Sequence, residues 1–108
     1  MSDRLPTHLV VGALLRRIND AGGMAVVRAR GDAQAGTVLV LLDAPGGTRA
    51  LERGIGPDGA TALIESRRPD AAEPIDEYWR RRRQRDPDLW VIELEGAGAE
   101  TATTELLI

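Results

Sequence analysis

The stretch from Ile75 to Glu95 constrains the fold most, because a helical pattern stands directly before a strand pattern. The spacing i, i+3, i+4, i+7 of one helix face is met by Ile75, Tyr78, Trp79 and Arg82. Pro87 disfavours helical backbone at the residue before it, so the helix has to end near Arg85. Strict alternation follows, with Trp90, Ile92 and Leu94 on one side. The pattern predicts a helix over 74–85 and a strand over 89–95.

The aromatic residues fall almost entirely inside this stretch, which holds both tryptophans and the only tyrosine of a chain without phenylalanine. A short turn between the predicted helix and strand brings Tyr78 and Trp79 near Trp90. We therefore expect an aromatic centre of the core, with Trp90 largely buried, Trp79 partly buried and Tyr78 near the edge.

The remaining elements follow from turn chemistry. A helix over 7–21 has Thr7 as a candidate N-terminal cap and ends at Gly22-Gly23. Alternating or continuous apolar runs predict strands, and turns rich in glycine, proline or aspartate separate them. These strands span 24–30, 37–42, 48–53 and 61–66.

This order of elements predicts an α+β fold. Short connections favour antiparallel neighbours, so we expect a mainly antiparallel sheet of four to five strands with two helices on one face. Residues 1–95 are expected to form the single α+β domain. Residues 96–108 are expected to form a C-terminal tail, flexible where it starts and apolar where it ends, which docks on its own sheet or on a partner.

Composition restricts the chemistry. The chain has no cysteine, one histidine, and fourteen basic residues that are all arginine, so thiol nucleophiles, thiolate metal sites and titrating lysines are excluded. These absences disfavour an enzyme, and we expect no cofactor. The sequence shows neither a signal segment nor an apolar run of about 18 residues, which favours a cytoplasmic protein away from the membrane.

One glycine pattern, Gly54 to Gly59, matches the dinucleotide-binding spacing G-x-G-x-x-G. That function requires a helix after the glycines, whereas residues 61–64 have the pattern of a strand. Pro57-Asp58-Gly59 is also a common β-turn sequence, so we interpret the segment as a hairpin loop.

His8 and the Asp86-x-Asp88 pair are the nearest approaches to a catalytic or metal site. No serine elbow or carboxylate cluster accompanies either of them. We interpret His8 as a surface residue and the aspartates as a turn after the helix.

The arginine run at 80–85 is the clearest candidate for a binding surface. On a helix its members spread around much of the circumference and could contact phosphates. The alternative is a solvated helix end paired with the acids on either side of it. The candidate surface comprises Arg80, Arg81, Arg83, Arg85, Asp86 and Asp88.

The stretch Arg85-Asp86-Pro87-Asp88-Leu89-Trp90-Val91-Ile92-Glu93 resembles the signature of a small bacterial family of unknown function, about as long as this chain. Supporting stretches are residues 4–8, 14–17, 30–36 and 38–40. The resemblance implies no activity, ligand or catalytic residue. It does imply that Arg85, Asp86, Asp88 and Trp90 belong to a shared signature, whose role is structural or functional.

The sequence therefore predicts a non-enzymatic accessory or interaction domain with an unknown protein partner, and its apolar C-terminal end suggests a homodimer. The alternative function is weak, sequence-independent nucleic-acid binding through the arginine helix. Nucleic acid is disfavoured as a partner because acidic segments flank that helix and the net charge of the chain is −3.

Overall fold

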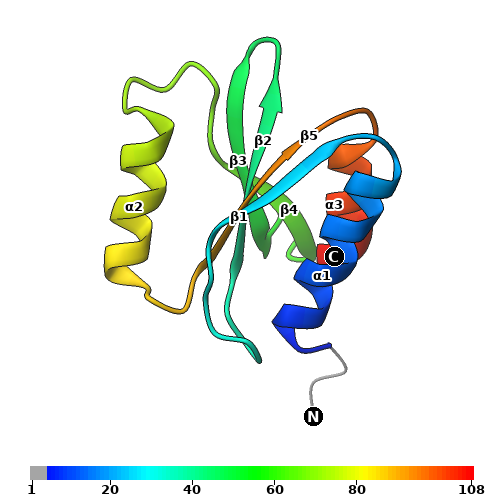
Figure 1. The fold of residues 1–108 in the computed structure, drawn as a ribbon. Helices are drawn as coiled ribbons and strands as arrows, with labels where there is room; N and C mark the ends of the chain where they lie inside the picture. Colours follow the sequence, from blue (N-terminus) through cyan, green and yellow to red (C-terminus); the bar gives the residue numbers. More distant parts are fainter. Residues whose placement is uncertain (1–4) are drawn as a thin grey trace.

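The computed structural model describes residues 5–108, which form three helices and five strands (Figure 1). The helices and strands predicted from the sequence are confirmed within a few residues, and a third helix is added. None of the helices within 5–108 is both long enough and apolar enough to cross a bilayer. In chain order the elements are α1 (Thr7–Asp20), β1 (Met24–Ala29), β2 (Val38–Ala44), β3 (Gly47–Ile55), β4 (Thr61–Arg67), α2 (Ile75–Arg85), β5 (Trp90–Glu95) and α3 (Ala99–Leu107).

The five strands form one sheet in the order β1-β5-β2-β3-β4. Three of the neighbouring pairs are antiparallel, as predicted, and the pair β2–β5 is parallel, with Val38 opposite Trp90 and Leu42 opposite Leu94. Parallel neighbours require a long crossover, which here consists of β3, β4 and α2. The final strand therefore enters the middle of the sheet, where the continuous apolar run of β2 provides a buried neighbour.

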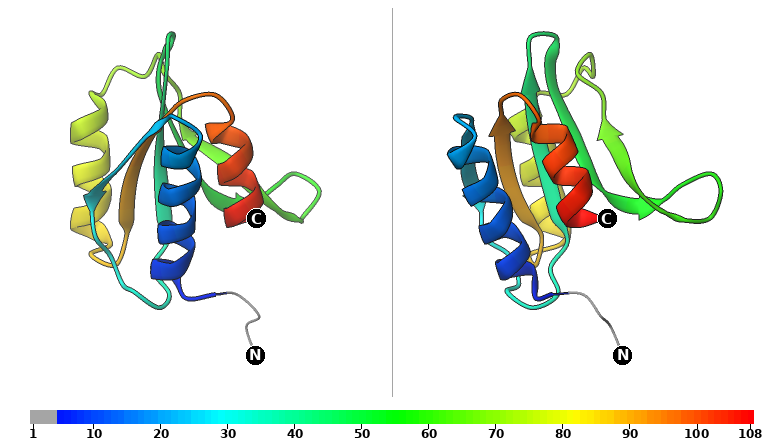
Figure 2. Two further views of the ribbon diagram at one scale, coloured as in Figure 1. Left: turned by 45° about the vertical axis from the view of Figure 1, so that its right-hand side comes forward. Right: turned by 90° about the vertical axis from the view of Figure 1, so that its right-hand side faces the viewer.

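Helices cover both faces of the sheet, so the prediction of two helices on one face is wrong. Helices α1 and α3 lie side by side on one face and α2 lies alone on the other (Figures 1 and 2). The reason is the alternation of β5, because both of its sides are apolar and both must be covered. Trp90, Ile92 and Leu94 pack under α1 and α3, whereas Leu89 and Val91 pack under α2.

The expected aromatic centre does not exist, because the sheet separates the two tryptophans. Trp90 is only 2% exposed, as predicted, and its indole Nε1 donates to the carbonyl oxygen of Asp32 at 2.7 Å. Tyr78 and Trp79 are buried on the opposite face, more deeply than expected. A short turn fixes how near α2 lies to β5 but not the side of the sheet to which each strand residue points.

Residues 99–107 of the expected tail form helix α3, which packs on α1 and on the same face of the sheet. Gly96 and Gly98 have positive φ, which permits the turn from β5 into this helix. The buried side of α3 consists of small residues, Ala99, Ala102 and Thr103, and the hydroxyl of Thr103 is satisfied by the carbonyl of Ala99 at 2.8 Å. Small side chains have a weak helical signature in the sequence, which is why this helix was not predicted.

The prediction that Thr7 caps α1 is wrong. Pro6 occupies the capping position, and the buried Thr7 hydroxyl donates instead to the carbonyl of Gly36 at 2.8 Å. The loop after β1 therefore takes the hydrogen bond that was expected to remain within the helix.

Truncation of the central tryptophan tests this core. Trp90→Ala should lower the free energy of unfolding by about 3–5 kcal/mol, because it removes a buried aromatic side chain. Urea denaturation followed by circular dichroism measures this loss. An unchanged denaturation midpoint would contradict the burial of Trp90.

A double-mutant cycle with Trp90→Phe and Trp79→Phe provides the control for the placement on two faces. The two losses should add within about 0.3–0.5 kcal/mol, because the side chains share no contact. A larger coupling would indicate a shared aromatic cluster.

Candidate functional site

The arginines of α2 divide into residues that hold the fold and residues that face solvent. Arg82 forms a two-pronged ion pair with Glu52 of β3, at 2.6 and 2.9 Å, and also donates to the Tyr78 hydroxyl at 2.9 Å. Burial alone raises the pKa of Glu52, but the hydrogen bonds from Arg82 and Ser66 outweigh it and hold that pKa below its usual range. The pair fastens α2 to the sheet.

Arg81 and Arg83 also make specific contacts. Arg81 binds both carboxylate oxygens of Glu73, at 2.8 and 3.2 Å, and lies over the ring of Tyr78. Arg83 donates to the carbonyls of Arg30 and Leu89, each at 3.0 Å, and to that of Pro87. Arg83 therefore fixes the turn between α2 and β5.

The other four candidate residues have few contacts or only local ones. Arg80 is exposed and stacks over Trp79 at 4.9 Å, and Arg85 is exposed, with no ion pair to any of residues 5–108. The Asp86 carboxylate accepts from the backbone N–H of Asp88 at 3.1 Å, which closes the predicted turn. The binding surface expected over these six residues stays a prediction, with Arg81 and Arg83 already in specific contacts within the fold.

This division limits nucleic-acid binding by the helix. Two free arginines can contribute a slope of log affinity against log salt of at most about −1.8 on duplex DNA, by the rule of about −0.9 per phosphate contact. Fluorescence anisotropy across a salt series measures this slope. Replacing both Arg80 and Arg85 by alanine should make the slope less negative by no more than about 1.8. A steeper loss would mean that Arg81 or Arg83 leaves its present partners to bind phosphate.

Two of the stretches that carry the family resemblance meet at one junction, formed by residues 30–37 and 86–90. The backbone N–H of Asp32 donates to the carbonyl of Asp88 at 3.0 Å, and that of Trp90 to the carbonyl of Thr37 at 2.8 Å. A Cβ on Gly31 would lie 2.0 Å from the Asp88 carbonyl oxygen, so only glycine fits there. Asp88 and Trp90 therefore hold this junction together through their backbones.

The glycine motif and His8 are placed as predicted. Gly54 to Gly59 lead into the tight turn that joins β3 to β4, with the N–H of Gly56 donating to the carbonyl of Ala60 at 2.8 Å. His8 is exposed on α1 and its ring lies 3.0 Å from the carbonyl of Ala33. The hairpin prediction and the surface prediction are both confirmed.

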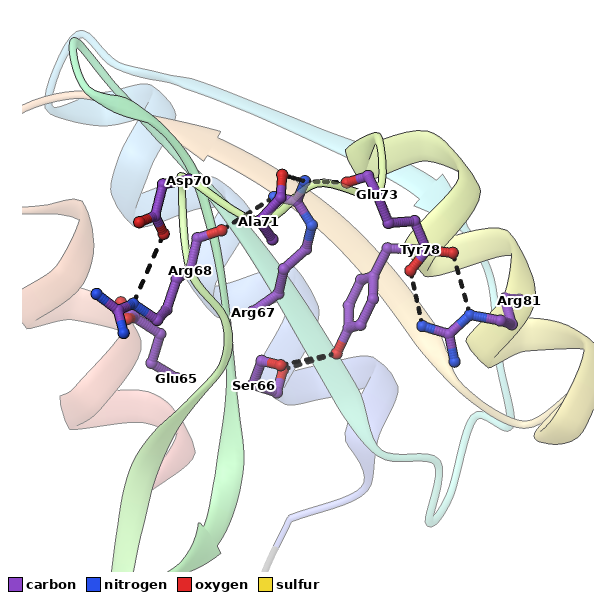
Figure 3. A pocket seen from close by; sticks show the side chains of 9 residues that line it. All are labelled: Glu65, Ser66, Arg67, Arg68, Asp70, Ala71, Glu73, Tyr78 and Arg81. Atoms are coloured by element: carbon purple, nitrogen blue, oxygen red, sulfur yellow. Dashed lines mark hydrogen bonds and ion pairs between the residues drawn. The ribbon is translucent and has the colours of Figure 1, made fainter.

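A pocket lies between β4, the loop after it and α2, and two ion pairs form among the side chains that line it (Figure 3). Arg68 faces Asp70 at 3.6 Å, and Arg81 is held by Glu73. The Tyr78 hydroxyl donates to Ser66 Oγ at 3.0 Å, and Arg67 donates to main-chain carbonyls. These contacts stabilise the loop over 68–74.

Two acidic side chains share the α2 face of the central strands. The neighbouring Asp43 carboxyl group, burial and the charge of Asp76 together raise the pKa of Glu93 to about 7, and Asp43 has the largest effect. Arg28, whose Nε lies 3.6 Å from a Glu93 oxygen, partly offsets the rise. Glu93 therefore keeps its proton to a higher pH than an ordinary glutamate does.

This pair predicts a pH dependence of stability. The folded pKa of Glu93 is about 7, and an unfolded glutamate titrates near 4.3, so the folded chain binds the proton more tightly. The resulting stabilisation is complete below about pH 4.3 and is lost as the pH rises toward about 7. Glu93→Gln should remove this dependence and raise stability at about pH 8 by on the order of 1 kcal/mol, screening included. Urea midpoints across pH measure it, with the exposed Glu95→Gln as control; parallel profiles for wild type and Glu93→Gln would contradict it.

A groove of 770 Å³ lies on the opposite side of the sheet, at the edge of the α1 and α3 layer. The start of α1, the end of α3 and the β3–β4 hairpin form its walls. Large apolar side chains that remain exposed gather there, with Leu5 64%, Ile55 69% and Ile108 46% exposed. The apolar end at Leu106-Leu107-Ile108 was expected to dock, but Leu5 and Ile55 each stand alone in the sequence, so no local pattern indicates the groove.

Arg53 of β3 is the only charged side chain that lines the groove within residues 5–108. It is half-buried, and its Nε is buried without a hydrogen-bond partner in the described part of the chain. The groove thus combines an apolar lining with one positive charge that has no partner carboxylate there.

The fold and the sites together define a small three-layer α+β protein. Most arginines within residues 5–108 that form ion pairs or hydrogen bonds hold loops in place or join a helix to the sheet. Residues 5–108 contain no group of three His, Cys, Asp or Glu side chains that could hold a metal ion. The chain belongs to the family described as "Protein of unknown function (DUF1491)", which matches residues 5–103 and confirms the resemblance found in the sequence.

Solved structures of similar proteins have the same fold. A crystal structure of a DUF1491 family protein from Caulobacter crescentus CB15 is 36% identical, with a TM-score of 0.73, and the match covers 85% of this chain and 88% of that one. An NMR structure of a DUF1491 family protein from the same source is 34% identical, with a TM-score of 0.71 and 91% of both chains covered. The solution structure of protein Atu0922 from A. tumefaciens is 27% identical, with a TM-score of 0.69, and the match covers 89% and 91% of the two chains. The comparison with curated proteins gave no match.

Proposed function

We propose that this protein is a non-enzymatic accessory domain that binds a partner protein through the groove beside α1 and α3. The observation that carries the proposal is the clustering of exposed apolar side chains. Three of the five large apolar residues exposed within 5–108 line this one groove, namely Leu5, Ile55 and Ile108. Contiguous exposed apolar surface favours a protein interface, because water is displaced from it on binding.

The rigid surroundings of the groove support the same function. The start of α1 is anchored by Thr7, whose N–H and hydroxyl both donate to carbonyls of the loop over 34–36. The hairpin is paired along its length from Arg53–Leu63 to Ile55–Thr61. A pre-formed surface loses little conformational entropy when a partner binds.

The expectation of a homodimer stays a prediction, and α3 changes how it must be tested. Deleting residues 96–108 would remove Ala99 and Ala102 from the core, so the loss of a dimer would not identify the tail as the interface. The bacterial and cytoplasmic setting also stays a prediction. Weak nucleic-acid binding is the less favoured function, because most arginines of α2 already have partners.

A charge placed in the groove should abolish partner binding. Ile55→Asp places a carboxylate at a position where the native side chain is 69% exposed. Folding should therefore be unaffected, while apolar contact with a partner is lost. Proteins that the wild-type chain captures are identified and purified. Each is then titrated by calorimetry against the wild-type chain and against Ile55→Asp. We expect Ile55→Asp to weaken the binding of a true partner at least tenfold.

The matched control is Leu9→Asp, at a leucine 48% exposed on α1 that does not line the groove. It should leave affinity within about twofold, because it makes the same chemical change on a surface outside the groove. Equal effects of the two substitutions, or none from either, would contradict the groove as the binding surface.

A further inference from the structure

The positive charge of Arg53 has no carboxylate partner within residues 5–108, in contrast to Arg49 and Arg82 nearby. On the same strand, Arg49 pairs with both Glu65 and Glu100. Arg82, which also reaches β3, pairs with Glu52. Arg53 instead lies half-buried among apolar residues, and one of its nitrogens is buried without a partner. A guanidinium in such surroundings gains strongly from a carboxylate brought by a ligand.

A second copy of this chain that binds groove to groove adds no acidic side chain beside Arg53. No acidic side chain lines the groove within the described residues. A two-fold contact of groove on groove would place the same patch of both copies together, and with it two Arg53 guanidinium groups. Like charges in a buried contact are unfavourable, so charge complementarity argues for a different molecule.

A small amphipathic carboxylate is also a poor match. Pockets for small ligands enclose most of the ligand surface. This groove is open, since Leu5 and Ile55 on its walls are 64% and 69% exposed. An open apolar groove is instead covered well by a polypeptide segment, which spans several side-chain positions at once.

We propose, resting on the function proposed above, that the groove recognises a polypeptide segment that combines large apolar side chains with an aspartate or glutamate. The apolar side chains pack against Ile55, Leu106 and Ile108, and the carboxylate pairs with the Arg53 guanidinium. The apolar contacts supply affinity, and the charge selects acidic segments over neutral ones.

Selection from a displayed library of random twelve-residue peptides, followed by anisotropy titration of the best labelled peptide, tests this pairing. Enriched peptides should combine at least two large apolar residues with an acid. Replacing that acid by its amide should weaken binding to the wild-type chain at least tenfold. Arg53→Met, which keeps the length of the side chain and removes its charge, should cause a similar loss and make the two peptides equal. Arg85→Met on α2 is the matched control and should change nothing.

The outcomes separate this inference from the function on which it rests. Peptides that need Ile55 but bind equally well as acid and amide would overturn the carboxylate pairing and leave the groove as an interface. No enrichment above an unrelated control protein, or binding insensitive to Ile55→Asp, would overturn both. Displacement of the peptide by dodecanoate would indicate a small carboxylate as the occupant of the groove and overturn the acidic segment. A dimer in sedimentation that Ile55→Asp dissociates would indicate a second copy of the chain as the occupant and overturn it likewise. If Arg53→Met fails to fold, the comparison of acid and amide peptides on the wild-type chain still decides.

Discussion

The parallel pairing of β2 with β5 is the constraint on which the rest of the molecule depends. It places the last strand between β1 and β2, so the two most apolar strands lie at the centre of the sheet. Both sides of β5 then face apolar neighbours, and each face of the sheet requires a helical layer. The crossover that permits this pairing also carries α2 to the face opposite α1 and α3 (Figure 2).

The two layers are held by different interactions, and this difference separates structure from function. Helices α1 and α3 pack through aliphatic and small side chains. Helix α2 packs through Tyr78 and Trp79. It is also held by polar contacts near its C-terminal end, with Arg82 on Glu52 and Arg83 on three main-chain carbonyls. The most conspicuous charged stretch of the sequence is thereby largely used within the fold. On the other side of the sheet, Arg53 has a buried Nε without a hydrogen-bond partner and Ile55 is exposed.

Local patterns predicted the elements well, because each depends on nearby residues. The alternation around Trp90 gave both the strand and its burial, and Pro87 gave the end of α2. The strand order could not be predicted, since it depends on which distant segments pair. The layer of α2 and the third helix were missed for related reasons: a turn does not determine the face, and Ala99 and Ala102 have little periodic signal.

The candidate site was the least predictable part. The groove gathers side chains from both ends of the described chain and from the β3–β4 hairpin, and no local pattern joins them. The sequence around Arg53 does not indicate that its Nε is buried without a hydrogen-bond partner, because that depends on distant residues. Two of the signature stretches meet at the junction of residues 30–37 and 86–90, where backbone hydrogen bonds and the close approach of Gly31 to Asp88 hold them together.

Native-state amide hydrogen exchange, measured residue by residue by NMR, tests the central role of the β2–β5 pair most directly. The amides of Val40 and Ile92 at the centre of this pair should exchange only through global unfolding, since they are fully buried between two layers. The amides of α2 should exchange faster, through local opening that leaves the rest of the sheet intact. Exchange of the Ile92 amide at the rate of the α2 amides would contradict the account.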